Sequence, residues 1–315
     1  MNTTAAKIPE INPQLQAAPQ GLQQQFQAAS PFRHLVLQDF FNQTLLAQLV
    51  AQFPPFEKTD CRNEKGEPGL KGVFPHIAEL GGAYSRLDRL VKSRSFLDWL
   101  SACTGIEGLL YDPFYFGGGT HENRPGQDLD LHIDFNLHPL THWHRRLNLI
   151  VYLNDEWHED WGGNLILRRD PRDLNSSSVC VPPRRNCCVV FETTEHSWHG
   201  FERIKAPAPD QGRKSIALYF YTRKRPVEET ASAHSTVYIE PPLPDHFKPG
   251  YTLGTDDIGE LKILLKRRDE HLDRIYADNQ RLQATLELWR NRFFGSRTTG
   301  MLRWCRYKYL LWKQK

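Results

Sequence analysis

The fold is decided by residues 147–167, LNLIVYLNDEWHEDWGGNLIL. Two apolar runs rich in Leu, Ile and Val flank a polar segment that closes with Gly162 and Gly163. Short apolar runs separated by Gly, Pro, Asn and Asp are typical of β-strands joined by turns. The same pattern continues in both directions and predicts eight strands: Leu110–Phe116, Leu129–Phe135, Leu147–Leu153, Asn164–Leu167, Val179–Val181, Cys187–Phe191, Trp198–Ile204 and Ser215–Tyr221.

Strands of this number and length predict a mainly β domain with some α-helix, built as a double-stranded β-helix, or jelly roll. An immunoglobulin-type sandwich has a similar pattern of turns, but this chain lacks the Cys, Trp, Cys landmark of that fold. Apolar residues at helical spacing predict flanking helices before the strands, at residues 42–53 and 84–104. A long helical extension is expected after the strands.

The chain is therefore expected to have three segments. Residues 1–29 are rich in Gln, Ala and Pro and carry few charges, which predicts a flexible N-terminal arm. Residues 30–245 form the predicted jelly-roll domain, with core strands at about 110–222. Residues 246–315 form the helical extension.

The composition excludes several classes of protein. Hydrophobic residues make up 39% of the 315 residues and charged residues 24%, so the chain as a whole can bury a core. A net charge of +3 is too small to predict a nucleic-acid partner. The six cysteines show no CxxC spacing and no disulfide framework, which favours a reducing cytosol. Without a signal-peptide pattern or a membrane span, we expect a cytoplasmic protein.

Three residues in the predicted strands form a candidate metal site. His132 and Asp134 are two residues apart in one strand, so their side chains point to the same face. His199 lies in SWHG, at the start of a later strand that the jelly roll places opposite. Two His and one carboxylate form the facial triad that holds Fe(II) and leaves coordination positions open. The neighbouring His196 is a rival ligand, but apolar residues after His199 favour His199.

A candidate anion site lies at the start of the last predicted strand. Arg213 and Ser215 are two residues apart and face the same way as the metal site. A planar guanidinium beside a hydroxyl can grip the distal carboxylate of a dicarboxylic acid. That arrangement suits 2-oxoglutarate, a co-substrate whose other end would bind the metal.

The stretch from Tyr111 to Thr222 resembles the 2-oxoglutarate/Fe(II)-dependent oxygenase superfamily, and within it the prolyl 4-hydroxylase-like branch. The resemblance rests on HID at 132–134, RRLNLIVYLNDEW at 145–157, GGNLIL at 162–167, SWHGFERI at 197–204 and RKSIALYFY at 213–221.

This resemblance implies a dioxygenase that uses Fe(II), 2-oxoglutarate and O2, with ascorbate as an optional further cofactor. It implies hydroxylation of an unactivated C–H bond of an unidentified primary substrate, with release of succinate and CO2. By the same likeness, Tyr152 donates its phenol to the co-substrate beside Arg213, and Asn148 lines the same wall. Tyr115 corresponds to a first-strand tyrosine near the iron.

The C-terminal extension carries a different pattern. Asp257 marks the expected start of a helix, and from Leu261 to Phe293 apolar or seam positions alternate by four and three residues, with Asn279 at one of them. This spacing predicts a coiled coil over 257–293 and a homodimer through it, whereas an amphipathic helix lying along its own domain is the alternative. Residues 297–315 mix basic and aromatic side chains, which suits peripheral contact with an anionic membrane at its inner face. A tail that docks nucleic acid or protein is the competing interpretation.

A rival function of another class is a non-catalytic jelly-roll binding or scaffold protein that acts through its coiled coil and basic tail. The sequence argues against this rival, because His132, Asp134, His199 and Arg213 are all present. Each of these residues would be dispensable in a scaffold.

Overall fold

The structure is a computed structural model that describes residues 7–58, 60–62, 68–173, 175–239, 242–244 and 246–294. The chain divides into two compact units, Met1–Pro241 and Pro242–Lys315. The first unit holds all of the strands and helices α1 to α5, and the second holds helix α6. Among the described residues, no helix is long and apolar enough to cross a membrane.

The larger of two antiparallel sheets has eight strands, in the order β1-β10-β7-β12-β5-β3-β2, with β4 paired to β12. β12 is its central strand and pairs with β7 along most of its length. The bounds are β1 His34–Leu37, β2 Asp60–Arg62, β3 Pro68–Phe74, β4 Leu110–Tyr111, β5 Gly119–Asn123, β7 His144–Tyr152, β10 Cys188–Glu192 and β12 Arg213–Thr222.

The smaller sheet has five strands in the order β13-β6-β11-β8-β9. Its bounds are β6 Leu129–Ile133, β8 Leu165–Arg168, β9 Ser178–Val181, β11 Trp198–Phe201 and β13 Val237–Tyr238. Side chains of β7, β8, β9 and β10 form a buried apolar cluster, so the two sheets face one another across a common interior. Two antiparallel sheets packed in this way confirm the predicted jelly roll.

The predicted strands are present, with their ends shifted by a few residues, except that the first is cut to β4. It ends early because the carboxylate of Asp112 accepts hydrogen bonds from the backbone N–H groups of Phe114 and Phe116, which turns the chain. Strand β5 was not predicted, because its sequence GTHEN contains no large apolar residue. β5 nevertheless pairs with both β12 and β3.

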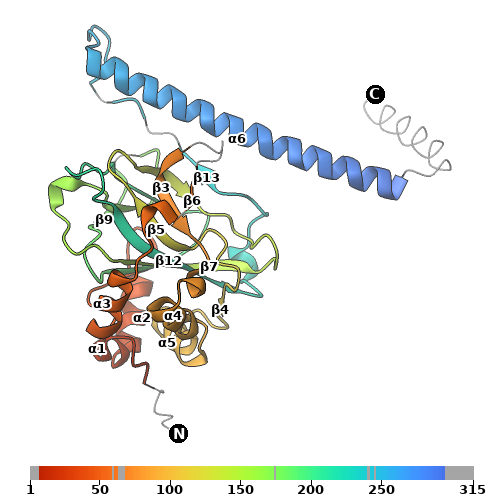
Figure 1. The fold of residues 1–315 in the computed structure, drawn as a ribbon. Helices are drawn as coiled ribbons and strands as arrows, with labels where there is room; N and C mark the ends of the chain where they lie inside the picture. Colours follow the sequence, from red (N-terminus) through yellow and green to blue (C-terminus); the bar gives the residue numbers. More distant parts are fainter. Residues whose placement is uncertain are drawn as a thin grey trace. The chain divides into compact units, whose positions relative to one another are not determined.

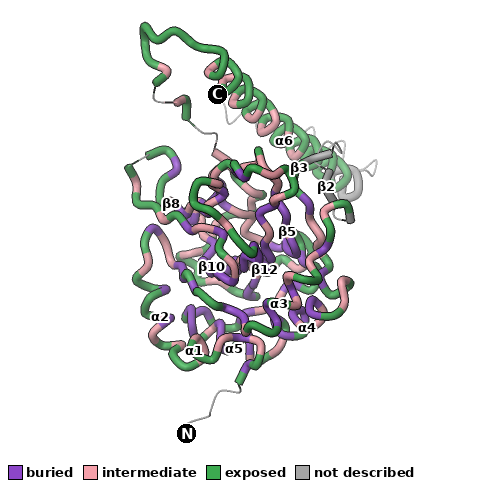
Figure 2. Tube along the Cα trace, turned by 60° about the vertical axis from the view of Figure 1, so that its left-hand side comes forward, coloured by how far each residue is buried: buried purple, intermediate pink, exposed green. Residues whose placement is uncertain are grey.

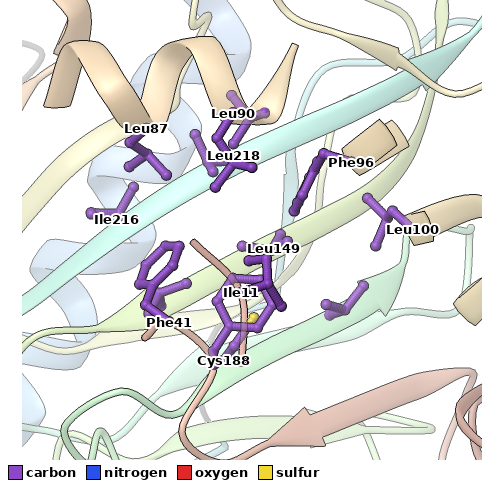
Figure 3. Close-up of a cluster of buried hydrophobic side chains, with 14 of the residues drawn as sticks. Ile11, Phe41, Leu87, Leu90, Phe96, Leu100, Leu149, Cys188, Ile216 and Leu218 are labelled. Atoms are coloured by element: carbon purple, nitrogen blue, oxygen red, sulfur yellow. The ribbon is translucent and has the colours of Figure 1, made fainter. Parts of the chain in front are cut away.

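Five helices lie together on the outer side of the larger sheet (Figure 1). Side chains of α4 and α5, among them Leu87, Leu90 and Phe96, meet Ile216 and Leu218 of β12 in the main core (Figure 3). The larger sheet is therefore buried on both faces, one against helices and one against the smaller sheet. The helices are α1 Pro13–Gln16, α2 Pro19–Ala28, α3 Gln43–Ala51, α4 Gly82–Val91 and α5 Arg94–Thr104.

The N-terminal segment differs from the flexible arm predicted over residues 1–29. From residue 7 it is described, and it carries α1 and α2. Leu22 and Phe26 are four residues apart on α2, so they share one face, and that face packs into the main core. Ile8 and Ile11 are buried in the same core. The folded unit thus begins well before residue 30, and it ends at Pro241 instead of residue 245.

The second unit contains α6, a single helix from Thr255 to Phe294. The predicted helical extension is confirmed over this range. Most of its large apolar side chains are exposed, including Leu272, Ile275, Leu282 and Leu286 of the predicted seam (Figure 2). The predicted basic and aromatic tail, residues 297–315, lies outside the described residues.

The packing of α2 gives a first prediction. Phe26→Ala should lower the free energy of unfolding by about 3–5 kcal/mol, because it leaves a cavity where a fully buried ring now sits. Gln25→Ala, at an exposed position on the same helix, is the matched control and should change stability little. Urea unfolding followed by circular dichroism measures both. Equal stability of the two variants would show that residues 1–29 are the dispensable arm that the sequence suggests.

Candidate active site

The three predicted metal ligands meet inside the jelly roll. His132 lies on β6, His199 lies on β11, and these two residues are direct partners in the antiparallel pairing of the strands. Asp134 follows the end of β6, and one donor atom from each of the three side chains lies within 4.8 Å of the others. No other such group of His, Cys, Asp or Glu occurs in the part of the chain that the structure describes.

Both imidazoles are oriented so that Nε2 faces the cluster. Nδ1 of His132 lies 2.9 Å from the carbonyl oxygen of Asp130, and Nδ1 of His199 lies 2.9 Å from that of Ser197. A carbonyl oxygen only accepts, so each Nδ1 carries the proton and each Nε2 keeps its lone pair. Burial lowers the pKa of both rings, that of His132 to about 3, so both are neutral ligands at neutral pH.

The close approach of β6 and β11 explains why glycine follows the second histidine. A Cβ atom at Gly200 would lie 2.4 Å from the carbonyl oxygen of Leu129 on β6, which no side chain can tolerate. The pairing of the two strands shifts register between His199 and Phe201. Gly200 therefore allows β11 to approach β6 closely enough for its histidine to reach the cluster.

Asp134 is held by two polar side chains of β7. Its Oδ2 atom accepts a hydrogen bond of 2.8 Å from the amide of Asn148 and lies 3.1 Å from Nη2 of Arg145. Burial opposes ionisation of Asp134, but the Arg145 guanidinium beside it outweighs burial, and the pKa of the carboxyl group is lowered to about 2. The carboxylate is thus ionised, and its Oδ1 and Oδ2 atoms lie 3.9 Å from Nε2 of His132 and 3.4 Å from Nε2 of His199.

Arg145 was not predicted, and a β-bulge explains why. Along β12 and β7, Phe220 pairs with Leu147 but Tyr221 pairs with Arg145, so β7 has one extra residue at this point. The extra residue moves Arg145 onto the inner face that Asn148 occupies. Its guanidinium is buried, donates to the carbonyl of the Asn148 amide, and stacks over the Tyr219 ring.

The structure also brings together Arg213 and Tyr152, which were predicted to bind the distal carboxylate of a ligand. Arg213 at the start of β12 donates from Nη2 to the Tyr152 hydroxyl at 3.0 Å and from Nε to the carbonyl of Gly163 at 2.7 Å. Its guanidinium lies over the rings of Tyr152 and Phe201. The side chain is fully enclosed, and burial lowers its pKa. Within the described residues no carboxylate pairs with it, so a buried cation is available to an anionic ligand.

Gly163, the second residue of the Gly-Gly motif, makes room for this arginine. Its φ of +69° lies in the left-handed region, and a Cβ atom there would meet Cδ of Arg213 at 3.3 Å and the Trp157 ring at 3.0 Å. The motif therefore belongs to the anion site as well as to the turn between strands.

Ser215 lies on the same face of β12 as Arg213 and pairs with Tyr152 on one side and His121 of β5 on the other. His121 was not predicted, because the sequence gives no strand pattern at β5. Burial lowers its pKa to about 3, and its Nε2 atom is buried without a hydrogen-bond partner. This unpaired nitrogen, beside Arg213 and Ser215, is a further polar group available to a ligand.

Two predicted residues have different surroundings from those expected. Tyr115 does not approach the metal ligands: its hydroxyl donates to Asp88 of α4 at 3.0 Å, and its ring lies in the core between the helices and the larger sheet. A positive φ of 49° at Tyr115, in the turn after β4, directs it there. The Asn148 side chain, expected beside the co-substrate, is instead bonded to Asp134 and Arg145.

The segment after β12 covers the metal ligands. β13 pairs with β6, and the Tyr238 ring stacks on the His132 imidazole with centroids 5.1 Å apart. Asn136, just after the metal-binding strand, donates to the carbonyl of Ser232 and accepts from the N–H of His234. Phe191 of β10 packs against His199 from the other side. Aromatic rings therefore shield both imidazoles from water.

The donor set fits Fe(II). Two neutral imidazole nitrogens and one carboxylate oxygen converge from one side, which is the facial arrangement that leaves the remaining positions to other ligands. No cysteine contributes, as expected for a catalytic iron site and not for structural zinc. The described cysteines are free, and Cys187 and Cys188 are buried apolar residues as predicted.

Part of the chain matches a known protein family. Residues 118–221 match the family model described as the 2OG-Fe(II) oxygenase superfamily. The comparison with curated proteins found no match.

Among solved structures the chain is similar to a prolyl hydroxylase of Trichoplax adhaerens in complex with a hypoxia-inducible-factor peptide, at 15% identity over 66% of this chain and 90% of that chain, with a TM-score of 0.47. It is similar to a prolyl 4-hydroxylase of Phytophthora capsici at 17% identity, over 84% and 78%, with a TM-score of 0.49. It is also similar to HygX of Streptomyces hygroscopicus, solved with nickel, 2-oxoglutarate and hygromycin B, at 13% identity, over 64% and 91%, with a TM-score of 0.42.

The ligand set gives a second prediction. His132→Ala and His199→Ala should each weaken Fe(II) binding by more than the ~10–100-fold that loss of an outer partner costs, because each deletes a direct ligand. His196→Ala is the matched control, since His196 is exposed and stands three residues from His199. Anaerobic calorimetric titration with Fe(II) measures all three. If the His196 variant lost Fe(II) affinity and the other two variants kept it, His132 and His199 would not be the metal ligands.

Proposed function

Because residues 118–221 belong to the 2-oxoglutarate/Fe(II) oxygenase superfamily, we propose that this protein hydroxylates an unactivated C–H bond of a primary substrate while converting 2-oxoglutarate and O2 to succinate and CO2. One observation carries the proposal. Arg213, a buried arginine that no carboxylate of the described residues pairs with, lies on the β12 face that leads to the His132, Asp134 and His199 cluster. A dicarboxylate with one end at each site satisfies both.

Some residues of the site would bind the metal ion, and others orient a metal ligand. Fe(II), when bound, supplies the electron transfer and O2 chemistry that side chains cannot. His132, His199 and Asp134 provide the ligands, and Asn148 and Arg145 fix the orientation of the carboxylate.

At the other end, Arg213 and the Tyr152 hydroxyl bind the distal carboxylate of 2-oxoglutarate, and Ser215 and His121 flank it. Each of these groups is buried or enclosed between the sheets, so a charge-assisted hydrogen bond formed there is stronger than in water. The Tyr152–Arg213 hydrogen bond is already present, so the anchor is oriented before the ligand arrives.

Hydroxylation as the reaction type is supported by the motifs that resemble the prolyl-hydroxylase branch, above all HID at 132–134 and YLND at 152–155. The rival proposal is a scaffold without catalytic activity. Succinate release from 2-oxoglutarate distinguishes them, because a scaffold has no reason to decarboxylate a 2-oxo acid. The assay uses Fe(II), ascorbate and a panel of candidate substrates.

The anion anchor gives a third prediction. Arg213→Ala should weaken 2-oxoglutarate binding by roughly 2–5 kcal/mol, because it removes one partner of a buried charge pair, while Fe(II) affinity stays near that of the wild type. Arg203→Ala, at an exposed arginine ten residues earlier, is the control. Calorimetry and succinate release measure the two effects. If 2-oxo acids without a distal carboxylate support the wild type as well as 2-oxoglutarate does, Arg213 is not the anchor.

We also propose that α6 mediates self-association. Its seam positions alternate by four and three residues, and most of the described seam residues are exposed. Asn279 at the seam is a residue type that sets the register of parallel dimers. A second copy of the same helix presents the same seam, so pairing would cover both.

This proposal gives a fourth prediction. Leu272→Glu combined with Leu282→Glu should make the full-length protein monomeric, because it places charges at the seam. Ala277→Glu combined with Ala284→Glu is the control, since these positions lie opposite the seam on the heptad. Sedimentation velocity measures the mass of each. A wild-type monomer at micromolar concentration would remove the coiled coil and leave the oxygenase proposal untouched.

A further inference from the structure

Exposed apolar side chains gather around one buried histidine of the jelly-roll domain. Phe114 is 44% exposed, Phe116 is 46% exposed and Leu140 is 64% exposed. The rings of Phe114 and Phe116 lie 5.6 Å and 5.9 Å from the imidazole of His138, measured between ring centroids. The backbone N–H of Leu140 donates to Nδ1 of the same imidazole. These three side chains, together with that of Phe135, are called the aromatic surface below.

The aromatic surface is continuous with the residues that hold a metal ligand. Phe135 is half-buried and directly follows Asp134 in the sequence. Its ring meets that of Phe116 edge to face, with centroids 5.4 Å apart. The guanidinium of Arg145 lies 4.5 Å from the centroid of the Phe135 ring and 3.1 Å from Oδ2 of Asp134. A molecule that contacts Phe116 and Phe135 is therefore beside the metal cluster.

The turn that carries Phe114 and Phe116 is held in one conformation by hydrogen bonds. The carboxylate oxygens of Asp112 accept from the backbone N–H of Phe114 at 2.8 Å and from that of Phe116 at 2.9 Å. Tyr219 of β12 donates its hydroxyl to the carbonyl of Gly117 at 3.0 Å. The two exposed rings thus stand on a backbone that is fixed at several points.

The loop that carries Phe135 and Leu140 is connected to this turn through His138. Nδ1 of His138 accepts from the backbone N–H of Leu140 at 3.1 Å and from that of Thr141 at 3.2 Å. Since Nδ1 accepts, Nε2 carries the ring proton, and Nε2 lies 3.3 Å from Oδ1 of Asp112. Asp112 therefore contacts both segments, and the aromatic surface is oriented before a ligand arrives.

The two segments that form the aromatic surface contain no Asp, Glu, Lys or Arg. They are residues 113–118, PFYFGG, and residues 135–143, FNLHPLTHW. The charged residues that contact them have partners within the protein, since Asp112 faces His138 and Arg145 pairs with Asp134. Exposed rings without charged residues among them favour an uncharged apolar partner over an ionic one.

We propose that the aromatic surface binds an uncharged apolar group of the primary substrate. Its position beside the metal cluster favours the substrate as the occupant, because a molecule held there has its neighbouring C–H bonds close to the metal ligands. That the ligand is the substrate rests on the proposed oxygenase function, whereas binding of an apolar group next to the cluster does not. The primary substrate thus carries an aliphatic or aromatic group near the carbon that is hydroxylated.

The test uses full-length protein loaded with Mn(II) in place of Fe(II) and with excess 2-oxoglutarate. Mn(II) accepts oxygen and nitrogen donors, and its unpaired electrons speed the relaxation of the proton NMR signals of molecules bound near it. The probes are benzyl alcohol, which is uncharged and aromatic, and glycerol, which is uncharged and polar. We expect a relaxation enhancement that depends on Mn(II) for benzyl alcohol and none for glycerol.

Variants of the two exposed rings locate the bound probe. Phe114→Ser combined with Phe116→Ser should reduce the enhancement by roughly fivefold or more, because both ring contacts are lost. Phe114→Leu combined with Phe116→Leu keeps an apolar surface and should retain most of the enhancement. Val36→Ser, at an exposed apolar position of β1, is the control and should bind the probe as the wild type does. The Mn(II) and 2-oxoglutarate affinities of each variant report whether the metal cluster and Arg213 are intact.

Two results would overturn the proposal. One is the absence of enhancement in the wild type, and the other is equal enhancement in the wild type and the double serine variant. If the double serine variant keeps probe binding but loses mass in sedimentation velocity, the aromatic surface is a contact between two copies of the chain and not a substrate site.

Failure of the oxygenase function would look different. If benzyl alcohol binds near Mn(II) through Phe114 and Phe116 but no substrate leads to succinate release, the apolar binding site stands and the enzymatic role falls. If apolar and polar substrates stimulate succinate release equally, in the wild type and in the double serine variant, the oxygenase stands and the aromatic surface has no role in substrate selection.

Discussion

The antiparallel pairing of β6 with β11 is the constraint on which the site depends. It places His199 directly opposite His132, although 66 residues separate them in the sequence. Only glycine at position 200 lets the two backbones approach this closely, since a Cβ atom there would collide with β6. The antiparallel geometry then brings Asp134, just beyond the end of β6, to the same point. Without this pairing, the three ligands would not meet at one point.

Two buried arginines of the interior, Arg145 and Arg213, have different surroundings and therefore different functions. Arg145 is balanced by Asp134, so its charge holds a metal ligand in place and is not available to a substrate. Arg213 has no acidic partner among the described residues and is surrounded by a hydroxyl, a carbonyl and two aromatic rings, which suits a ligand carboxylate. Because an isolated charge is costly in a dry interior, the unbalanced positions mark where anionic ligands bind.

Alternation along strands predicts much of the site from sequence. It places His132 with Asp134 and Arg213 with Ser215, because side chains two residues apart share a face. The bonding of Tyr152 to Arg213 follows the resemblance to known motifs. The helical C-terminal extension is equally visible, because most of its seam positions, which alternate by four and three residues, are apolar.

The features that the sequence did not predict also have physical explanations. The bulge in β7 reverses the alternation and hides Arg145, and β5 has no apolar pattern from which His121 could be placed. A turn stabilised by Asp112 sends Tyr115 toward α4 instead of toward the metal. The N-terminal segment looks like a polar arm because it is rich in Gln, yet Ile8, Ile11, Leu22 and Phe26 are buried and anchor it in the core. Such tertiary effects leave no periodic trace in the sequence.

The central claim is that the metal cluster and Arg213 together hold 2-oxoglutarate. The most direct measurement is anaerobic calorimetric titration of 2-oxoglutarate into full-length protein with and without Fe(II). The account predicts one bound 2-oxoglutarate per chain, with affinity that rises when Fe(II) is present, because the ligand then contacts both sites. Affinity that is the same with and without Fe(II), or no binding in either case, would contradict it.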